Sequence, residues 1–160
     1  MGQNLAGFPE ITVRGKKGQK ITLLVSESLT DEGACNQRQT GRQHYYEYTL
    51  KGEGVETWHP CFSYYGFRYI QVEGAVLKGQ KNTLHLPVIQ KIQSCFVYNS
   101  APKVSTFQCS NRIFNEAHRL IEKAVRSNMQ SVFTDCPHRE KLGWLEQDHL
   151  CGPGLLYNYD

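Results

Sequence analysis

The hydrophobic period of this chain changes once, close to Ser110. Before that point apolar residues alternate with polar ones, as in half-buried strands. After it they recur at every third or fourth position, as in an amphipathic helix. The sequence therefore predicts a β-rich domain over residues 1–104, followed by a helical domain over residues 105–160.

The first region contains short strand-like runs punctuated by glycine. Ile11–Arg14 and Lys20–Val25 flank a glycine-containing turn and are predicted to pair as a hairpin. Short strands at this spacing favour an antiparallel β-sandwich. Further strands are expected over Tyr45–Leu50, Phe67–Val72 and Ile92–Tyr98, with long loops over Thr30–Gln43 and Lys78–Pro87.

The second region begins with one clearly amphipathic helix. We expect Ser110 to be its N-cap and the helix to end near Met129 or Ser131. A second helix is expected from Trp144 towards Tyr157, kinked or interrupted by Pro153. The apolar face of the first helix consists of Ile113, Ala117, Leu120, Ile121, Ala124 and Val125.

Two helices alone cannot bury such an apolar face. Helical architectures bury it by packing several helices around a common core. We therefore expect the helical region to be the opening of a larger helical domain.

Composition excludes several classes of function. The formal charge is +3 and is spread along the 160 residues, whereas binding to nucleic acid requires a concentrated basic face. No apolar run approaches the roughly 20 residues of a membrane span, and the start of the chain does not resemble a signal peptide. Localisation and oligomeric state stay open.

The six cysteines lack the spacing of a metal site. No two are closer than 14 residues, so the chain has no Cys-x-x-Cys pair. A disulfide framework is typical of shorter secreted chains. We expect free or buried thiols, no metal and no cofactor.

The stretch Thr134–His149 has the highest density of chemically active residues. It holds four carboxylates, two histidines, an arginine and a tryptophan. Paired carboxyls beside an aromatic ring fit glycoside hydrolysis, while a solvated loop between helices explains the same residue types. Two weaker alternatives are a Cys136–His138 nucleophile–base pair and a metal site of His138, Asp148 and His149.

Two aromatic clusters permit a second kind of interpretation. His44–Tyr46 and Ser63–Tyr65 could form sugar-stacking platforms or a nucleic-acid surface. Cross-strand aromatic pairs within a sheet need no further function, and we favour that interpretation.

Three motifs together resemble one family. Thr134–Trp144, with the sequence TDCPHREKLGW, resembles the signature of bacterial α-L-rhamnosidases of glycoside hydrolase family seventy-eight. The opening Gly2–Gly7 and the stretch Thr57–Tyr69 resemble two segments of that family's β-sandwich. The motifs occur in family order and the resemblance covers essentially the whole chain.

The resemblance implies a sandwich packed on the start of an (α/α)6 barrel. It also implies hydrolysis of terminal α-L-rhamnosyl groups of glycosides or polysaccharides with inversion. It places the general acid on Glu140, a sugar-contacting carboxylate on Asp135 and a site-lining side chain on Arg139. Trp144 is expected to form an aromatic wall or to pack in the barrel core.

Two departures qualify this expectation. Gln147 stands where many members have a substrate-contacting aspartate, a role that could be lost or pass to Glu146 or Asp148. The family's general base lies further along the barrel, so we expect this chain alone to be inactive. The alternative function is a non-catalytic sugar-binding or scaffold sandwich.

Overall fold

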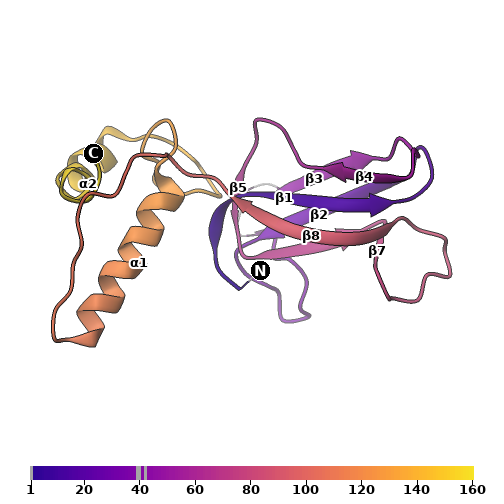
Figure 1. The fold of residues 1–160 in the computed structure, drawn as a ribbon, viewed down its shortest axis with the longest axis horizontal. Coiled ribbons are helices and arrows are strands. Elements are labelled where there is room, and N and C mark those ends of the chain that lie inside the picture. The colour runs from indigo at the N-terminus through magenta and orange to yellow at the C-terminus, as the bar shows by residue number, and fades with distance from the viewer. Residues whose placement is uncertain (1, 39–40, 42) are drawn as a thin grey trace. The chain divides into compact units, whose positions relative to one another are not determined.

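The computed structural model describes residues 2–38, 41 and 43–160. The chain divides into two compact units, Met1–Phe96 and Val97–Asp160. The first consists of strands and the second of helices and their connections (Figure 1). The expected order, a β-sandwich followed by helices, is confirmed.

The larger sheet of the first unit is built around β1. Its strand order is β4-β1-β8-β7, and β5 also pairs with β1. All pairs are antiparallel except β7 with β8. The strands are β1 (Leu5–Arg14), β4 (Val55–Trp58), β5 (Tyr65–Phe67), β7 (Val76–Leu77) and β8 (Val88–Phe96).

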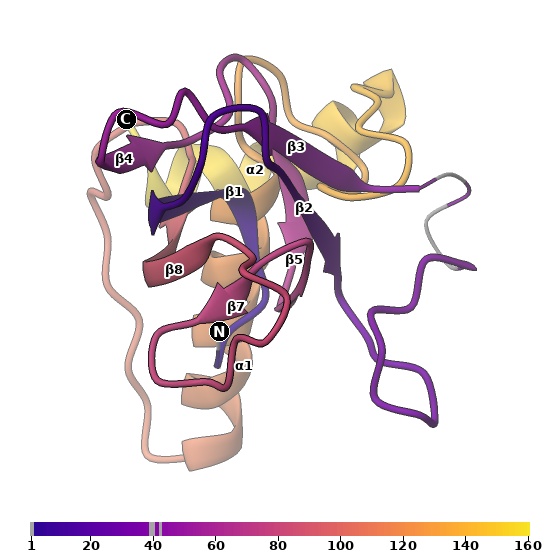
Figure 2. The same ribbon diagram turned by 90° about the vertical axis from the view of Figure 1, so that its right-hand side faces the viewer.

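The smaller sheet has the order β3-β2-β6 and is antiparallel throughout. In Figure 2, β2 and β3 run together on one side of β1, with β8 on the other. The strands are β2 (Lys20–Ser26), β3 (Tyr45–Thr49) and β6 (Tyr69–Glu73).

Alternation along the strands fills the space between the two sheets. Every second residue of β1 and β2 is fully buried, as the period of two requires. Gly7 permits the close approach of β8, because a Cβ at this position would lie 1.9 Å from the Cys95 carbonyl oxygen. The core consists of Ile11, Val13, Ile21, Leu23, Val25, Tyr46, Leu50, Phe67 and Ile89.

The predicted hairpin between Ile11–Arg14 and Lys20–Val25 is wrong. The two runs form β1 and β2, which belong to different sheets and do not pair. The Gly15–Gln19 connection crosses between the sheets, held by hydrogen bonds from Gly18 N–H to Leu50 O and from Leu50 N–H to Gln19 O, both 2.9 Å. Strands on opposite sides of one core show the same alternation as paired strands, so alternation could not tell them apart.

The run Phe67–Val72, predicted as one strand, is divided at Arg68. Phe67 ends β5 in the larger sheet, and Tyr69 begins β6 in the smaller one. The Arg68 N–H donates to Ser26 O at 2.9 Å, which turns the chain at this corner. A strand that changes sheets keeps an unbroken apolar pattern, which hides the corner in the sequence.

The first helix of the second unit, α1, spans Arg112–Asn128. Its N-cap is Asn111, whose Oδ1 accepts from the Ile113 N–H at 2.9 Å, so the predicted Ser110 cap is wrong by one residue. Both residue types suit the position. Backbone conformation, which the local sequence does not reveal, selects between them.

The second helix, α2, spans Leu145–Asn158 and contains Pro153 without interruption. The segment after β8 ties the ends of the two helices together. The Asn99 N–H donates to Met129 O, past the end of α1, and the Val104 N–H donates to Asn158 O, at the end of α2. No helix of the described residues is long and apolar enough to cross a membrane.

Candidate active site

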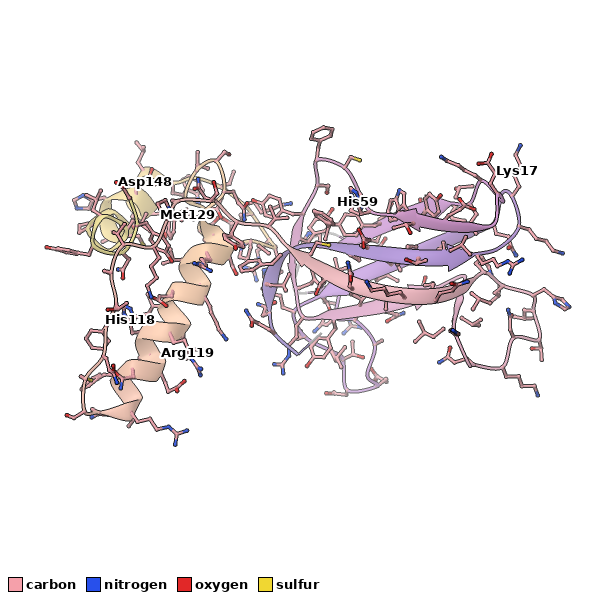
Figure 3. All side chains as sticks on the ribbon, viewed as in Figure 1. Lys17, His59, His118, Arg119, Met129 and Asp148 are labelled. Carbon is pink, nitrogen blue, oxygen red and sulfur yellow. The ribbon has the colours of Figure 1, made fainter. Side chains whose placement is uncertain are left out.

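The predicted site lies in the segment that joins α1 to α2. Figure 3 labels Met129, just past α1, and Asp148, in the first turn of α2, which flank this segment in the sequence. Thr134 is buried and anchors its start, because its N–H and its hydroxyl both donate to Asn128 O, at 2.9 and 3.2 Å. The acidic loop, Asp135–Leu142, therefore begins from a fixed point at the end of α1.

Two hydrogen bonds close the acidic loop on itself. The Asp135 N–H donates to Leu142 O, and the Leu142 N–H donates to Asp135 Oδ1, both at 3.0 Å. Lys141 has φ of 55°, in the left-handed region that non-glycine residues rarely adopt. This conformation turns the chain back directly after Glu140. Backbone strain of this kind is common at functional sites.

Cys136 links the two acidic residues of the loop. Its Sγ accepts from the Glu140 N–H at 3.3 Å, and its thiol hydrogen-bonds the Asp135 carboxylate. The loop thus brings two acidic residues, five positions apart in sequence, into contact with one thiol.

The electrostatics of Asp135 follow from these contacts. Partial burial raises the pKa of Asp135, because it disfavours the charged form. Hydrogen bonds from the Leu142 N–H and from Cys136 outweigh burial and hold the pKa of Asp135 below its ordinary value of 3.8. Asp135 is therefore ionised at neutral pH.

The other predicted site residues lie around this pair. Arg139 and Glu140 are exposed, whereas Asp135 is half-buried. Trp144 is the N-cap residue of α2 and its side chain is 52% exposed. Gly143 precedes it, and a Cβ there would lie 2.9 Å from Val132 Cγ2. The Gly-Trp pair of the motif therefore lies where the loop passes close to Val132.

The first turn of α2 carries Glu146 and Asp148. Negative charge at a helix N-terminus interacts favourably with the helix dipole, which gives both carboxylates a structural reason for their position. Gln147, at the departure from the family motif, donates its backbone N–H to Trp144 O at 2.9 Å. This bond forms the first turn of α2.

The aromatic clusters of the sandwich have a structural role. His44 and Tyr46 are 1% and 6% exposed. Both rings pack against Tyr65, with centroids 4.2 Å and 5.3 Å away. A buried ring cannot stack on a sugar. Because Tyr46 lies in β3 of the smaller sheet and Tyr65 in β5 of the larger one, their contact joins the two sheets, and the expected cross-strand pairing within one sheet is wrong.

Sequence reasoning missed the structural part played by Cys136. It weighed Cys136 only as a nucleophile paired with His138, whereas its thiol hydrogen-bonds Asp135 and the Glu140 backbone. The signal was its place between the two acidic residues of one motif. Among the described residues no group of three or more His, Cys, Asp or Glu side chains could hold a metal ion.

Comparison with known proteins assigns both units. Residues 1–98 match the bacterial alpha-L-rhamnosidase concanavalin-like domain, and residues 102–160 match the bacterial alpha-L-rhamnosidase 6 hairpin glycosidase domain. A sandwich followed by the first helices of a six-hairpin glycosidase domain defines a class of glycoside hydrolase. The chain belongs to the bacterial α-L-rhamnosidase family.

Individual relatives agree with this assignment. An α-L-rhamnosidase of Formosa agariphila is 34% identical over 165 aligned positions, covering 99% of this chain and 16% of that protein. The solved structure of the Streptomyces avermitilis α-L-rhamnosidase complexed with L-rhamnose matches with 31% identity and a TM-score of 0.81, over 99% of this chain and 15% of that one. An α-L-rhamnosidase from Dictyoglumus thermophilum matches with 31% identity and a TM-score of 0.83, over 99% and 17%.

The chain therefore spans about a sixth of the length of these relatives. The family resemblance inferred from the three sequence motifs is confirmed over both units.

Proposed function

We propose that this chain is part of an α-L-rhamnosidase that releases terminal α-L-rhamnosyl groups from glycosides or polysaccharides with inversion. Family membership over both units supports the proposal. A relative whose structure contains L-rhamnose matches 99% of the chain. The observation that carries the assignment to this site is the closed acidic loop, which holds Asp135 and Glu140 around Cys136 in the segment that matches the glycosidase domain.

Glu140 is the proposed general acid, which protonates the leaving glycosidic oxygen. A general acid must hold a proton at the start of the reaction. Asp135, whose pKa is lowered, is the ionised carboxylate of the same loop and is therefore suited to contacting sugar hydroxyls and not to the role of the acid.

The neighbouring residues take supporting roles in this proposal. Asp135, as an ionised carboxylate, accepts hydrogen bonds from sugar hydroxyls. Arg139 lines the site and is exposed at the tip of the loop next to Glu140. Trp144 supplies an aromatic wall at the start of α2, where about half of its side chain is accessible.

An inverting site needs a second carboxylate, which activates a water from roughly 6.5–9.5 Å away on the opposite face of the sugar. We assign this general base to a part of the longer protein outside these 160 residues. The isolated chain should therefore give no turnover of an aryl α-L-rhamnoside. Turnover by the chain alone would show that the base lies within it.

The decisive substitution is Glu140→Gln in the longer protein that carries this chain. A general acid contributes about 10²–10⁴-fold to the rate, so kcat for an unactivated alkyl α-L-rhamnoside should fall within that range. The loss should be smaller for 4-nitrophenyl α-L-rhamnoside, because 4-nitrophenolate leaves without protonation. Steady-state rates on a series of leaving groups measure this difference.

The matched control is Glu116→Gln, the same change on the exposed surface of α1, where Glu116 pairs with Arg119. We expect wild-type rates from it. Proton NMR of the first sugar released should show the β-anomer if the reaction inverts. Equal losses on all leaving groups, or an unchanged rate, would remove Glu140 from the role of acid.

A further inference from the structure

The thiol of Cys136 occupies a central position in the acidic loop. Its Sγ lies 3.3 Å from the Glu140 backbone nitrogen and accepts that N–H. The same thiol hydrogen-bonds Asp135, whose Oδ1 also accepts the Leu142 N–H at 3.0 Å. One short side chain therefore contacts both acidic residues.

A thiol can hold both contacts at once because it has one S–H donor and a sulfur acceptor. Accepting the Glu140 N–H fixes the backbone from which the Glu140 carboxyl extends. Donating to Asp135 fixes the carboxylate that closes the same loop by accepting the Leu142 N–H. Lys141, with its left-handed φ of 55°, follows directly, so backbone strain and the thiol act on the same turn.

We propose that Cys136 is a positioning residue that holds Glu140 and Asp135 in the relative geometry needed for proton donation. The inference rests on the proposed function of Glu140. It assigns no nucleophilic, redox or metal-binding chemistry to the thiol. It concerns how the acid is held, whereas the proposed function concerns which residue is the acid.

The test compares three substitutions in the longer protein. Cys136→Ser keeps one donor and one acceptor, Cys136→Ala removes both, and Cys136→Val removes both while keeping a side chain of similar volume. Hydrogen bonds to charged groups contribute enough that their loss is expected to lower kcat about tenfold or more in the Ala and Val variants. The Ser variant should retain most of the rate.

The pH profile separates positioning from general destabilisation. Without the thiol donor, the pKa of Asp135 moves up, since that hydrogen bond favours its charged form. The acidic limb of the kcat profile should therefore shift to higher pH in Cys136→Ala and Cys136→Val and return in Cys136→Ser. KM should change less than kcat. Cys61→Ala is the matched control, because Cys61 is an exposed free thiol in the sandwich.

Each outcome decides the inference. Wild-type kcat and an unmoved pH profile in both Cys136→Ala and Cys136→Val would overturn it, as would a Ser variant no better than the Ala variant. If Cys136→Ala does not fold, the same comparison of kcat and pH profile is made between Cys136→Val and Cys136→Ser. The proposed function fails separately, if Glu140→Gln leaves the rate unchanged on poor leaving groups. An inactive wild-type protein would overturn both.

Discussion

The two units of this chain differ in how they bury apolar side chains. The sandwich encloses nine core residues that are between 0% and 6% exposed. Neither α1 nor α2 contains a buried residue, and Ile113 and Leu156 are 75% and 82% exposed. Helices without a buried face gain little hydrophobic stabilisation, which comes mainly from tertiary packing.

The segments of the helical unit are connected by polar contacts and not by a buried hydrophobic core. Asn99 and Val104 donate backbone hydrogen bonds to residues at the ends of α1 and α2. Glu122 on α1 forms an ion pair with Lys103, whose hydrogen bond is the main cause of its lowered pKa, and lies 3.1 Å from His118 Nε2. The candidate site therefore lies in the unit whose stability depends less on buried apolar area. The related α-L-rhamnosidases are about six times as long as this chain. We infer that one unit completes its own core, while the other relies on packing that the longer protein supplies.

The largest effect on stability should come from Phe67→Ala. Phe67 is fully buried between the sheets, and truncation of a buried phenylalanine costs about 3–5 kcal/mol. The matched change Leu120→Ala, at a residue 63% exposed on α1, should cost within about 0.5 kcal/mol. Urea unfolding followed by circular dichroism measures both. Equal losses of unfolding free energy in the two variants would contradict the difference in burial between the sandwich and the helical unit.

An intermediate effect should follow acidification, through Glu56. Its carboxylate accepts from Tyr48 Oη at 2.6 Å and from the Lys51 and Gly52 N–H groups, both at 2.9 Å. These bonds, led by that of Tyr48, hold the pKa of Glu56 below its ordinary 4.5. Because the folded pKa is depressed, the stabilisation is complete above about pH 4.5 and is lost as pH falls through the folded pKa.

Glu56→Gln tests this expectation. The variant should be less stable than wild type at pH 7, and its stability should depend less on pH below 4.5. Urea unfolding at several pH values gives the two curves. The control is Glu47→Gln, which removes a surface ion pair with Lys20 and should have little effect. Parallel curves for wild type and Glu56→Gln would contradict the assignment.

The smallest effect concerns the cap of α1. Asn111→Ala should cost about 1 kcal/mol, because the side chain satisfies the Ile113 N–H. Ser110→Ala, one residue earlier, should cost close to nothing. Thermal unfolding followed by the helical circular dichroism signal distinguishes the two variants. A larger loss at Ser110 would restore the cap predicted from the sequence.

Much of the fold followed from periodicity. Alternation predicted β1 and β2, an aromatic and β-branched run predicted β3, and the three-to-four spacing predicted α1. The strands β4 and β7 are too short to show a period, and Glu56 in β4 is a buried carboxylate that a hydrophobic pattern does not anticipate. Strand pairing was less predictable, because β1 pairs with β8, far along the chain, instead of with its neighbour β2.

The candidate site was predictable as a motif but not as a geometry. Sequence pattern and family resemblance singled out Asp135 and Glu140. Neither showed that Lys141 adopts a left-handed φ or that Cys136 lies between the two acidic residues. Both depend on how the backbone closes the loop through Asp135 and Leu142.

By itself the sequence determined the two kinds of secondary structure, the order of the units and the family, because local periodicity and motif spacing are properties of neighbouring residues. The tertiary structure decided which strands share a sheet and where the chain turns at Arg68. It also decided how one thiol contacts both acidic residues of the loop. Those features arise from contacts between distant residues and from backbone torsions, and a hydrophobic pattern is compatible with several such arrangements.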